Sequence, residues 1–303
     1  MTLNLTRRDF LRAATAAGAV VSSSLASPSL HAAETSGHPW PASRGGLVDF
    51  NVTLSRWPFR RLPLDETPKL VARLRSHGVT RACAGSFDSL FHKDIGAVNS
   101  HLFEECRSHG HGLLIPFGAL NPQLPDWEED VRRCHEQFQM PGLRLYPNYH
   151  GYALDDPRFA KILDLAQARG LTVQLALSME DERTQHPLVR VPHVNVTPLL
   201  SLLTSRPNVR IVLLNWFRAV NGELLPKLAQ AGQVYFDIAT AEGVGGITNL
   251  LKQVPAHRVV FGSHAPFFYF ESALLKLKES VLADAELSAI RSANAQGLLS
   301  RQS

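Results

Sequence analysis

Cysteine is scarce in this 303-residue chain, which contains only Cys83, Cys106 and Cys134. An odd number of cysteines cannot all pair within one chain, and no Cys-x-x-Cys pattern occurs. The three residues lie in segments with strand-like or helical patterns. We therefore expect buried or partly buried thiols rather than a disulfide framework.

The sequence also lacks the signatures of nucleotide and nucleic acid binding. No Gly-x-Gly-x-x-Gly turn follows the first expected strand, and no Walker-type loop occurs. The formal net charge is +4, and the basic residues are scattered rather than gathered in a run with interleaved aromatic residues. No nucleic acid partner is indicated. Internal repeats and low-complexity tracts are absent outside the N-terminus.

The N-terminus carries a pattern typical of twin-arginine export signals. Two adjacent arginines lie within Thr6–Arg12, and a weakly apolar, alanine-rich stretch covers residues 13–26. Small residues at Ala32 and Ala33 suit cleavage. A short amphipathic or membrane-anchoring helix is the alternative, although the stretch is too short and too rich in Ala and Ser to span a bilayer. We expect a signal peptide over residues 1–33, recognised by the twin-arginine export machinery. The mature protein would be periplasmic or extracellular, without a membrane span.

A Ser-, Gly- and Pro-rich stretch over residues 34–46 predicts a flexible linker, after which apolar runs alternate with helical patterns. Eight such pairs in about 250 residues predict a single-domain α/β protein, a (β/α)8 TIM barrel over residues 47–303. A last helical pattern, 284–292, is expected to close the barrel floor. Alternation alone leaves a doubly wound open sheet as the competing fold. The expected strands are residues 47–52, 79–84, 113–119, 142–146, 171–177, 209–215, 234–239 and 258–263.

Several short segments are similar to the amidohydrolase-related family of (β/α)8 metal-dependent hydrolases and decarboxylases. The resemblance runs from about residue 48 to residue 299 and supports the TIM barrel. The segments that carry it are Val48–Asn51, Gly142–Tyr149, Asp155–Phe159, Gly262–Pro266 and Ser292–Ala295.

The family places metal ligands at the C-terminal ends of its strands, and this chain differs at each place. The resemblance implies His-x-His after strand one, a His after strands five and six, and an Asp after strand eight. Asn51, Thr53, Ala176, Asn215 and His264 stand there instead. Amide, hydroxyl and methyl groups do not hold zinc against water. We therefore expect neither the family's metal site nor another cofactor.

The polar residues left at the barrel mouth are the catalytic candidates. His264 either acts as general base, since its reference pKa lies near operating pH, or is a hydrogen-bonded structural histidine. Asn51 and Asn215 either donate to an oxyanion or a sugar hydroxyl, or tie loop backbones together. Asp237 is either a carboxylate partner or a member of a buried salt bridge. Some lactonases that resemble this family hydrolyse esters without a metal.

Residues in nearby loops are candidates for substrate binding. Arginines beside aromatic faces suit a carboxylate or a sugar ring, whereas a surface loop packed on apolar residues is the alternative. A polar run after the fifth strand contains one histidine and is by default a solvated loop. The substrate-binding candidates are Arg56, Trp57, Arg60, Tyr146, His150 and His186.

These observations favour a metal-free, hydrolase-like enzyme of the amidohydrolase-related type. Its substrate would be a small organic molecule, a lactone or a sugar-derived acid, by analogy with the metal-free lactonases. One alternative is a non-catalytic binding protein that keeps the barrel. The other is a hydrolase or decarboxylase with a metal site rebuilt from His150, His186 and His264.

Overall fold

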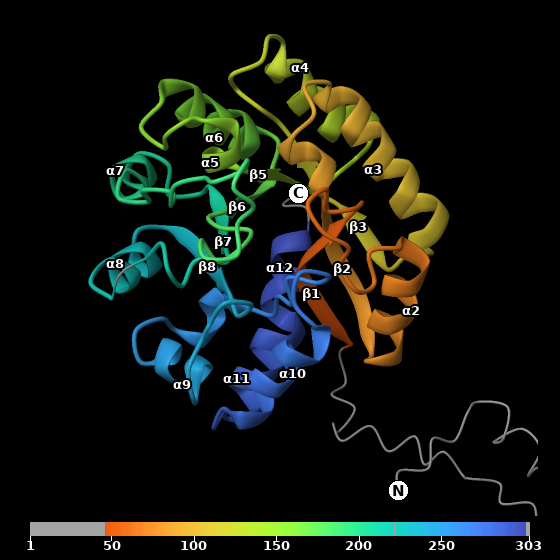
Figure 1. Cartoon of the computed structure of the whole chain (residues 1–303). Coiled ribbons are helices and arrows are strands. Elements are labelled where there is room, and N and C mark those ends of the chain that lie inside the picture. Colours follow the sequence, from red (N-terminus) through yellow and green to blue (C-terminus); the bar gives the residue numbers. More distant parts are fainter. Residues whose placement is uncertain (1–45, 221, 301–303) are drawn as a thin grey trace, which may run out of the picture. The chain divides into compact units, whose positions relative to one another are not determined.

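The computed structural model describes residues 46–220 and 222–300, so the expected leader and nearly all of the expected linker lie outside the described residues. Strands and helices alternate through the described part, as Figure 1 shows. Strands pair in parallel throughout, as expected when each crossover contains a helix. The strands are β1 (Leu47–Leu54), β2 (Val79–Ser86), β3 (Leu114–Pro116), β4 (Gly118–Ala119), β5 (Gly142–Leu145), β6 (Thr172–Ala176), β7 (Arg210–Leu214), β8 (Gln233–Asp237) and β9 (Val259–Val260).

The strands form two hydrogen-bonded groups, β1-β2-β3 and β4 through β9, that join at both ends. At one junction only Phe117 separates β3 from β4, and its N–H donates to the Ala84 carbonyl at 2.8 Å. At the other junction Phe50 N–H donates to the Phe261 carbonyl at 2.8 Å, and Thr53 N–H donates to the Ala265 carbonyl at 2.9 Å. The ring is therefore the predicted (β/α)8 barrel and not an open sheet.

Helices surround the strands, and several begin where the sequence supplies a cap (Figure 1). Asp94 and Asp156 accept backbone N–H bonds at the starts of α3 and α6, and Pro157 occupies the first turn of α6. The α-helices are α2 (Thr67–Ser76), α3 (Ile95–Gly110), α4 (Trp127–Arg132), α5 (Pro147–His150), α6 (Pro157–Ala168), α7 (Leu199–Thr204), α8 (Leu224–Gln230), α9 (Gly246–Leu251), α10 (Phe270–Glu279), α11 (Asp284–Ser288) and α12 (Asn294–Leu299).

Four shorter helical segments complete the secondary structure of the described residues. Two of them are π-helical turns that continue α4 and α11, so the closing helical region is longer than the expected 284–292. These segments are η1 (Phe87–Leu90), η2 (Arg133–Gln137), η3 (Ala256–Arg258) and η4 (Ala289–Ala293).

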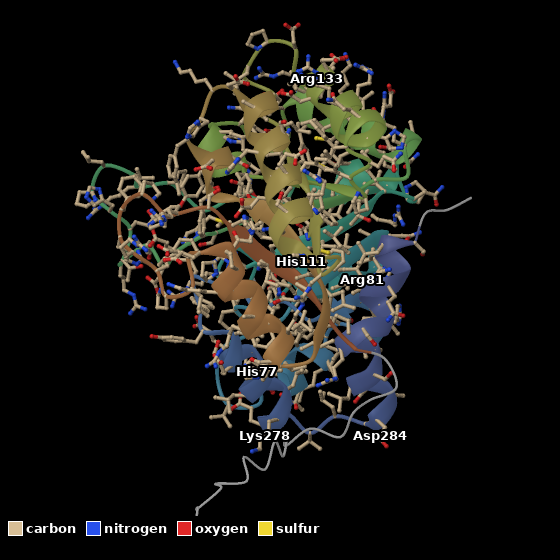
Figure 2. The ribbon with its side chains drawn as sticks, turned by 90° about the vertical axis from the view of Figure 1, so that its right-hand side faces the viewer. His77, Arg81, His111, Arg133, Lys278 and Asp284 are labelled. Atoms are coloured by element: carbon tan, nitrogen blue, oxygen red, sulfur yellow. The ribbon has the colours of Figure 1, made fainter. Side chains whose placement is uncertain are left out.

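The N-terminal end of the barrel is closed by α12. Thr172 Oγ1, at the start of β6, donates to the Leu298 carbonyl at 2.9 Å. Ala295 and Leu298 pack with Phe50 and Phe117 in one apolar cluster inside the barrel. Figure 2 shows α2 and α3 from outside, with their C-terminal caps His77 and His111 labelled. The opposite end of the barrel is the mouth, where the C-terminal ends of the strands meet.

All three cysteines are free thiols in the interior, as expected. Cys83 lies in β2, Cys106 in α3 and Cys134 in η2, and none is more than 3% exposed. Burial raises the pKa of the Cys106 and Cys134 thiols to about 12 and the pKa of Cys83 well above its usual value. Among the described helices, none combines the length and apolar character that a membrane crossing requires.

Candidate functional site

A cavity of about 300 Å³ opens at the barrel mouth beside the ends of β6, β7, β8 and β9. Its volume is at the lower end of the range for small-molecule sites. Ten of its thirteen lining residues are polar or charged, and the other three are two phenylalanines and a methionine. The lining residues are Arg60, Ser178, Met179, Glu180, Asp181, Thr184, Asn215, Arg218, Thr240, Glu242, His264, Phe267 and Phe268.

Three of the four catalytic candidates share one buried network beneath this cavity. Asn51 Nδ2 donates to Asn215 Oδ1 at 2.9 Å and to Asp237 Oδ2 at 2.7 Å. The backbone N–H of Asn215 donates to Asp237 Oδ1 at 3.0 Å. Asn51 lies in β1, Asn215 directly follows β7 and Asp237 is the last residue of β8, so neighbouring strand ends bring them together. Of the three, Asn215 also lines the cavity.

His264 joins the network at the cavity wall. Its Nε2 lies 2.8 Å from the Met179 carbonyl, which can only accept, so Nε2 carries the proton. Its Nδ1 then accepts from Asn215 Nδ2 over a longer 3.3 Å. Burial lowers the pKa of His264 to about 4, so the imidazole is neutral at pH 7.

Burial raises the pKa of the two carboxyl groups in and beside the network, whereas it lowers that of His264. Burial raises the pKa of Asp237 to about 7, although N–H bonds from Asn51 and Asn215 oppose the shift. It raises the pKa of Asp49 to about 6. Asp49 Oδ1 accepts the backbone N–H groups of Asn51 and Ser263, each at 3.0 Å. Asp49 therefore connects the first strand to the segment after the last strand.

The sequence analysis missed Asp49 and a second polar element, Arg144. Arg144 is 1% exposed, and its guanidinium donates to Gln174 Oε1 at 2.6 Å and to the carbonyls of Val52 and Cys83 at 2.7 and 3.0 Å. The available signal was a single polar residue between leucines in an expected strand, Leu143-Arg144-Leu145. Such a position requires buried partners for its donors.

An apolar cluster lies beside the cavity and shares Met179 and Phe267 with its lining. Trp57 contacts the rings of Phe87 and Phe267 at centroid distances of 5.4 and 4.9 Å, and Tyr146 and Ala176 belong to the same cluster. Trp57 is 3% exposed and Tyr146 is fully buried. The predicted substrate-binding roles of Trp57 and Tyr146 do not fit this structure, because packing leaves neither ring free for a ligand.

Of the six substrate-binding candidates, Arg60 lines the cavity. Arg56 lines a separate hollow beside Asp65 and His101. His186 stacks on Phe59 at 4.8 Å, outside the cavity lining. The Nε2 atom of His150 lies 2.8 Å from the Ser89 carbonyl, and that side chain is buried. The structure does not bring Arg56, His150 and His186 to this cavity, because the contacts of each lie elsewhere.

The residues at the family's ligand positions do not fit a metal ion. Ala176 offers a methyl group, and Asn51 directs its amide nitrogen, which has no lone pair available for a metal, toward Asn215 and Asp237. Nor do the described residues contain any group of three or more His, Cys, Asp or Glu side chains that could hold an ion. The rebuilt site of His150, His186 and His264 is therefore not assembled, because the rings are directed to different backbone or ring partners.

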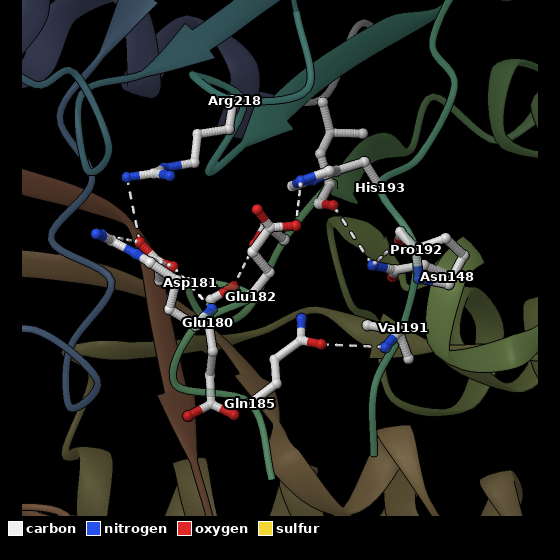
Figure 3. Close-up of polar contacts among 12 residues, drawn as sticks. Asn148, Glu180, Asp181, Glu182, Gln185, Val191, Pro192, His193 and Arg218 are labelled. Carbon is white, nitrogen blue, oxygen red and sulfur yellow. Dashed lines mark hydrogen bonds and ion pairs between the residues drawn. The ribbon is translucent and has the colours of Figure 1, made fainter. Parts of the chain in front are cut away.

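Ion pairs surround the rim of the cavity, mostly from the loop after β6. Figure 3 shows this loop, in which Asp181 pairs with Arg218 at 3.1 Å. Asp181 also pairs with Arg183 at 2.7 Å, and bonds from Arg183 hold the pKa of that carboxyl well below its usual range. Glu180 pairs with Arg60, and both residues line the cavity. The adjacent Glu182 points to His193 instead, at 3.5 Å (Figure 3).

Comparisons with known proteins agree with this architecture. A family model described as Amidohydrolase matches residues 44–301. No curated protein matches the chain.

Solved structures with similar folds each match 84% of this chain. The apo form of IDCase from Metarhizium anisopliae is 17% identical, with a TM-score of 0.61 over 97% of that chain. The 2,6-dihydroxybenzoate decarboxylase from Rhizobium is 14% identical, with a TM-score of 0.62 over 98% of that chain. The 5-carboxyvanillate decarboxylase from Sphingomonas paucimobilis is 12% identical, with a TM-score of 0.63 over 98% of that chain. At these identities the likeness concerns the fold.

Proposed function

The chain belongs to the amidohydrolase family, and from that membership we propose that it is an enzyme that hydrolyses a small organic molecule in the mouth cavity, a lactone or a sugar-derived acid. The observation that carries the proposal is the position of His264. His264 lines a cavity of ligand-binding size, and its imidazole is held by Met179 at Nε2 and by Asn215 at Nδ1. Fixed geometry of this kind suits proton transfer.

The proposed reaction uses the chain's own side chains, since the residues at the ligand positions do not fit a metal. Water attacks the ester carbonyl and gives one proton to His264 Nδ1, displacing the long bond from Asn215. The carbonyl carbon forms a bond to the water oxygen and loses its bond to the ring oxygen. That oxygen leaves as a hydroxyl after receiving the proton back from His264, and the product is a hydroxy acid. Asp237 holds Asn215 and Asn51 in place below.

The test begins with a screen of lactones and sugar-acid esters against the wild type. On any substrate found, His264→Asn is expected to lower kcat by about 10²–10⁴, because a general base is lost. Asparagine is chosen because it tolerates the left-handed backbone of this position. His193→Asn is the matched control: it removes a rim histidine that lies outside the cavity and should leave kcat unchanged.

The pH profile distinguishes the candidate bases. With His264 as base, the rate should hold from pH 8 to pH 5 and fall near pH 4, where the imidazole gains its proton. A fall below pH 7 would instead assign the base to Asp237. A folded His264→Asn variant with near-full activity would contradict the role of His264.

A second candidate function is binding without catalysis, and one observation favours it. Asn215 gives its amide hydrogens to the Ser178 carbonyl and His264, and Asn51 gives both of its own to Asn215 and Asp237. Neither amide has a donor left for an oxyanion. A ligand that binds the wild type with no turnover of any ester in the screen would select this function.

We also propose that the protein acts outside the cytoplasm. The proposal rests on the arginine pair, the alanine-rich stretch and the small-residue site, all within residues 1–33 and outside the described residues. Changing Arg7 and Arg8 together to Lys should retain the full-length precursor in the cytoplasm, as measured by fractionation and immunoblotting. Full delivery of the double variant to the periplasm would refute the export assignment.

A further inference from the structure

The charges around the mouth cavity bear on the class of substrate. We infer that the cavity selects an uncharged substrate and releases an anionic product, because both arginines that line it are already paired with carboxylates of the same wall. This inference rests on the proposed hydrolysis in that cavity. It narrows the two proposed substrate classes to the lactone or another uncharged ester.

The first pair is Arg60 with Glu180. The Glu180 side chain is 2% exposed, so its carboxylate is buried against the guanidinium, and both residues line the cavity. The same guanidinium lies 5.4 Å from the centre of the Phe267 ring. A buried carboxylate needs its counter-ion, so Arg60 is not free to bind a second anion at full strength.

The second pair involves Arg218, which meets two carboxylates. Asp181 lies 3.1 Å and Glu242 lies 3.7 Å from its Nη2 atom, and Figure 3 shows the contact with Asp181. Asp181 and Glu242 both line the cavity. With Glu180, three carboxylates therefore face two guanidinium groups on the cavity wall.

Other charged groups near the cavity do not supply a free cation to it. Arg183 is paired with Asp181 and does not line the cavity. Lys276 lies behind the wall, where its ammonium donates to the carbonyls of Ile238 and Ala239. His264 is neutral at pH 7.

An anionic ligand would have to share a guanidinium with a carboxylate that already occupies it. Like charges held this close repel each other, most strongly where solvent is limited. An uncharged ester meets no such repulsion, and Met179, Phe267 and Phe268 offer it apolar contacts. Hydrolysis of that ester creates a carboxylate, which the same charges disfavour, so the product should leave readily.

Benzamide and benzoate test the inference, because they match in size and differ in charge. Binding to the mature protein is measured by isothermal titration and ligand-observed NMR at neutral pH. We expect benzamide to bind about tenfold more tightly than benzoate. Glu180→Gln and Asp181→Asn, each nearly isosteric, should strengthen benzoate binding by about threefold to tenfold, a range set by the weight of a partly exposed ion pair.

Glu182→Gln is the matched control. It removes a carboxylate of the same loop that pairs with His193 and does not line the cavity. This variant should leave the ratio of the two affinities unchanged.

Equal or tighter binding of benzoate to the wild type would overturn the inference, and so would binding of neither probe. An unchanged ratio in both Glu180→Gln and Asp181→Asn would also overturn it. The measurement requires no turnover, so its outcome is separate from that of the lactone screen. If the protein hydrolyses anionic esters in preference to uncharged ones, the proposed function is supported and this inference is wrong.

Discussion

At the scale of single residues, two hydrogen-bonded residues of the mouth have an unusual backbone conformation. Asn215 and His264 have φ angles of 55° and 58°, in the left-handed region that side chains other than Gly rarely adopt. Each such residue costs on the order of 1 kcal/mol or more and persists only where the surroundings enforce it. Here the enforcing contacts are those of Asp237, Met179 and Asn51. The strain therefore serves the positioning of one imidazole at the cavity wall.

The pKa of His264 predicts a pH dependence of stability. Its folded pKa is about 4 and its ordinary value is 6.5, so between these values the unfolded chain binds the extra proton. The contribution of neutral His264 to the free energy of unfolding is therefore fully present above pH 6.5 and is lost as the pH falls towards 4. Relative to His264→Asn, the wild type should lose at most about 3 kcal/mol on going from pH 7 to pH 4.

Urea unfolding of both proteins across this pH range measures the difference. Asp49 and Asp237 remain in both, so their opposite dependence largely cancels. A difference that does not vary with pH would show that His264 titrates normally.

The structure brings together the four candidate residues at strand ends and leaves most of the loop candidates apart. Asn51, Asn215, Asp237 and His264 meet because the strand order of a barrel fixes which strand ends are neighbours. The direction of Trp57 depends instead on which rings fill the mouth, which is a property of packing between segments distant in sequence. The sequence near Trp57 does not determine which rings it packs against.

At the scale of elements, glycine decides how closely two strands approach. A Cβ atom on Gly142, at the start of β5, would overlap the Thr172 carbonyl oxygen of β6 and the Phe117 ring. Gly297 in α12 is the opposite case, since a Cβ atom there would meet nothing within 4 Å. The same substitution by alanine at these two positions therefore compares a closely packed strand with an open helix surface.

Gly142→Ala should lower the free energy of unfolding by about 1–3 kcal/mol, because the strands must separate to admit the methyl group. Gly297→Ala should raise it by about 0.5–1 kcal/mol through helix propensity. Urea denaturation followed by circular dichroism measures both. A stable Gly142→Ala protein would mean that the β5–β6 pairing is looser than described.

Each expected strand is present, since apolar runs bounded by polar turns are a strong local signal. The interruption at Phe117 and the short helix α5 were not foreseen. Phe117 turns into the barrel interior and its N–H bonds to β2, which only the neighbouring strand can require. Helix α5 is a single turn of four residues after β5, too short to carry a periodic pattern.

At the scale of the whole molecule, the chain has the fold of the amidohydrolase family, and the residues at the expected ligand positions do not fit a metal. The ligand positions hold amides, a hydroxyl, a methyl group and one neutral histidine, and the apolar cluster that contains Trp57 and Tyr146 packs beside them. Packing and hydrogen bonds hold the residues at these positions.

Chelation should therefore leave the thermal midpoint unchanged. A metal that binds the native state adds stability that a chelator removes. Differential scanning fluorimetry of the mature protein with excess EDTA, and again after zinc is restored, measures this. A clear fall in the midpoint that zinc reverses would contradict the conclusion that the residues of the mouth do not fit a metal. It would favour a metal site that includes histidines outside the cavity.

Whether the three thiols are oxidised depends on the compartment in which the chain folds. A thiol reacts as its thiolate, and burial holds Cys83, Cys106 and Cys134 in the protonated form and away from oxidants. An unfolded chain would expose all three with ordinary reactivity. In an oxidising compartment it could form mispaired or intermolecular disulfides that block the barrel. A chain exported after folding would not form these disulfides, so the buried cysteines are consistent with the proposed export route.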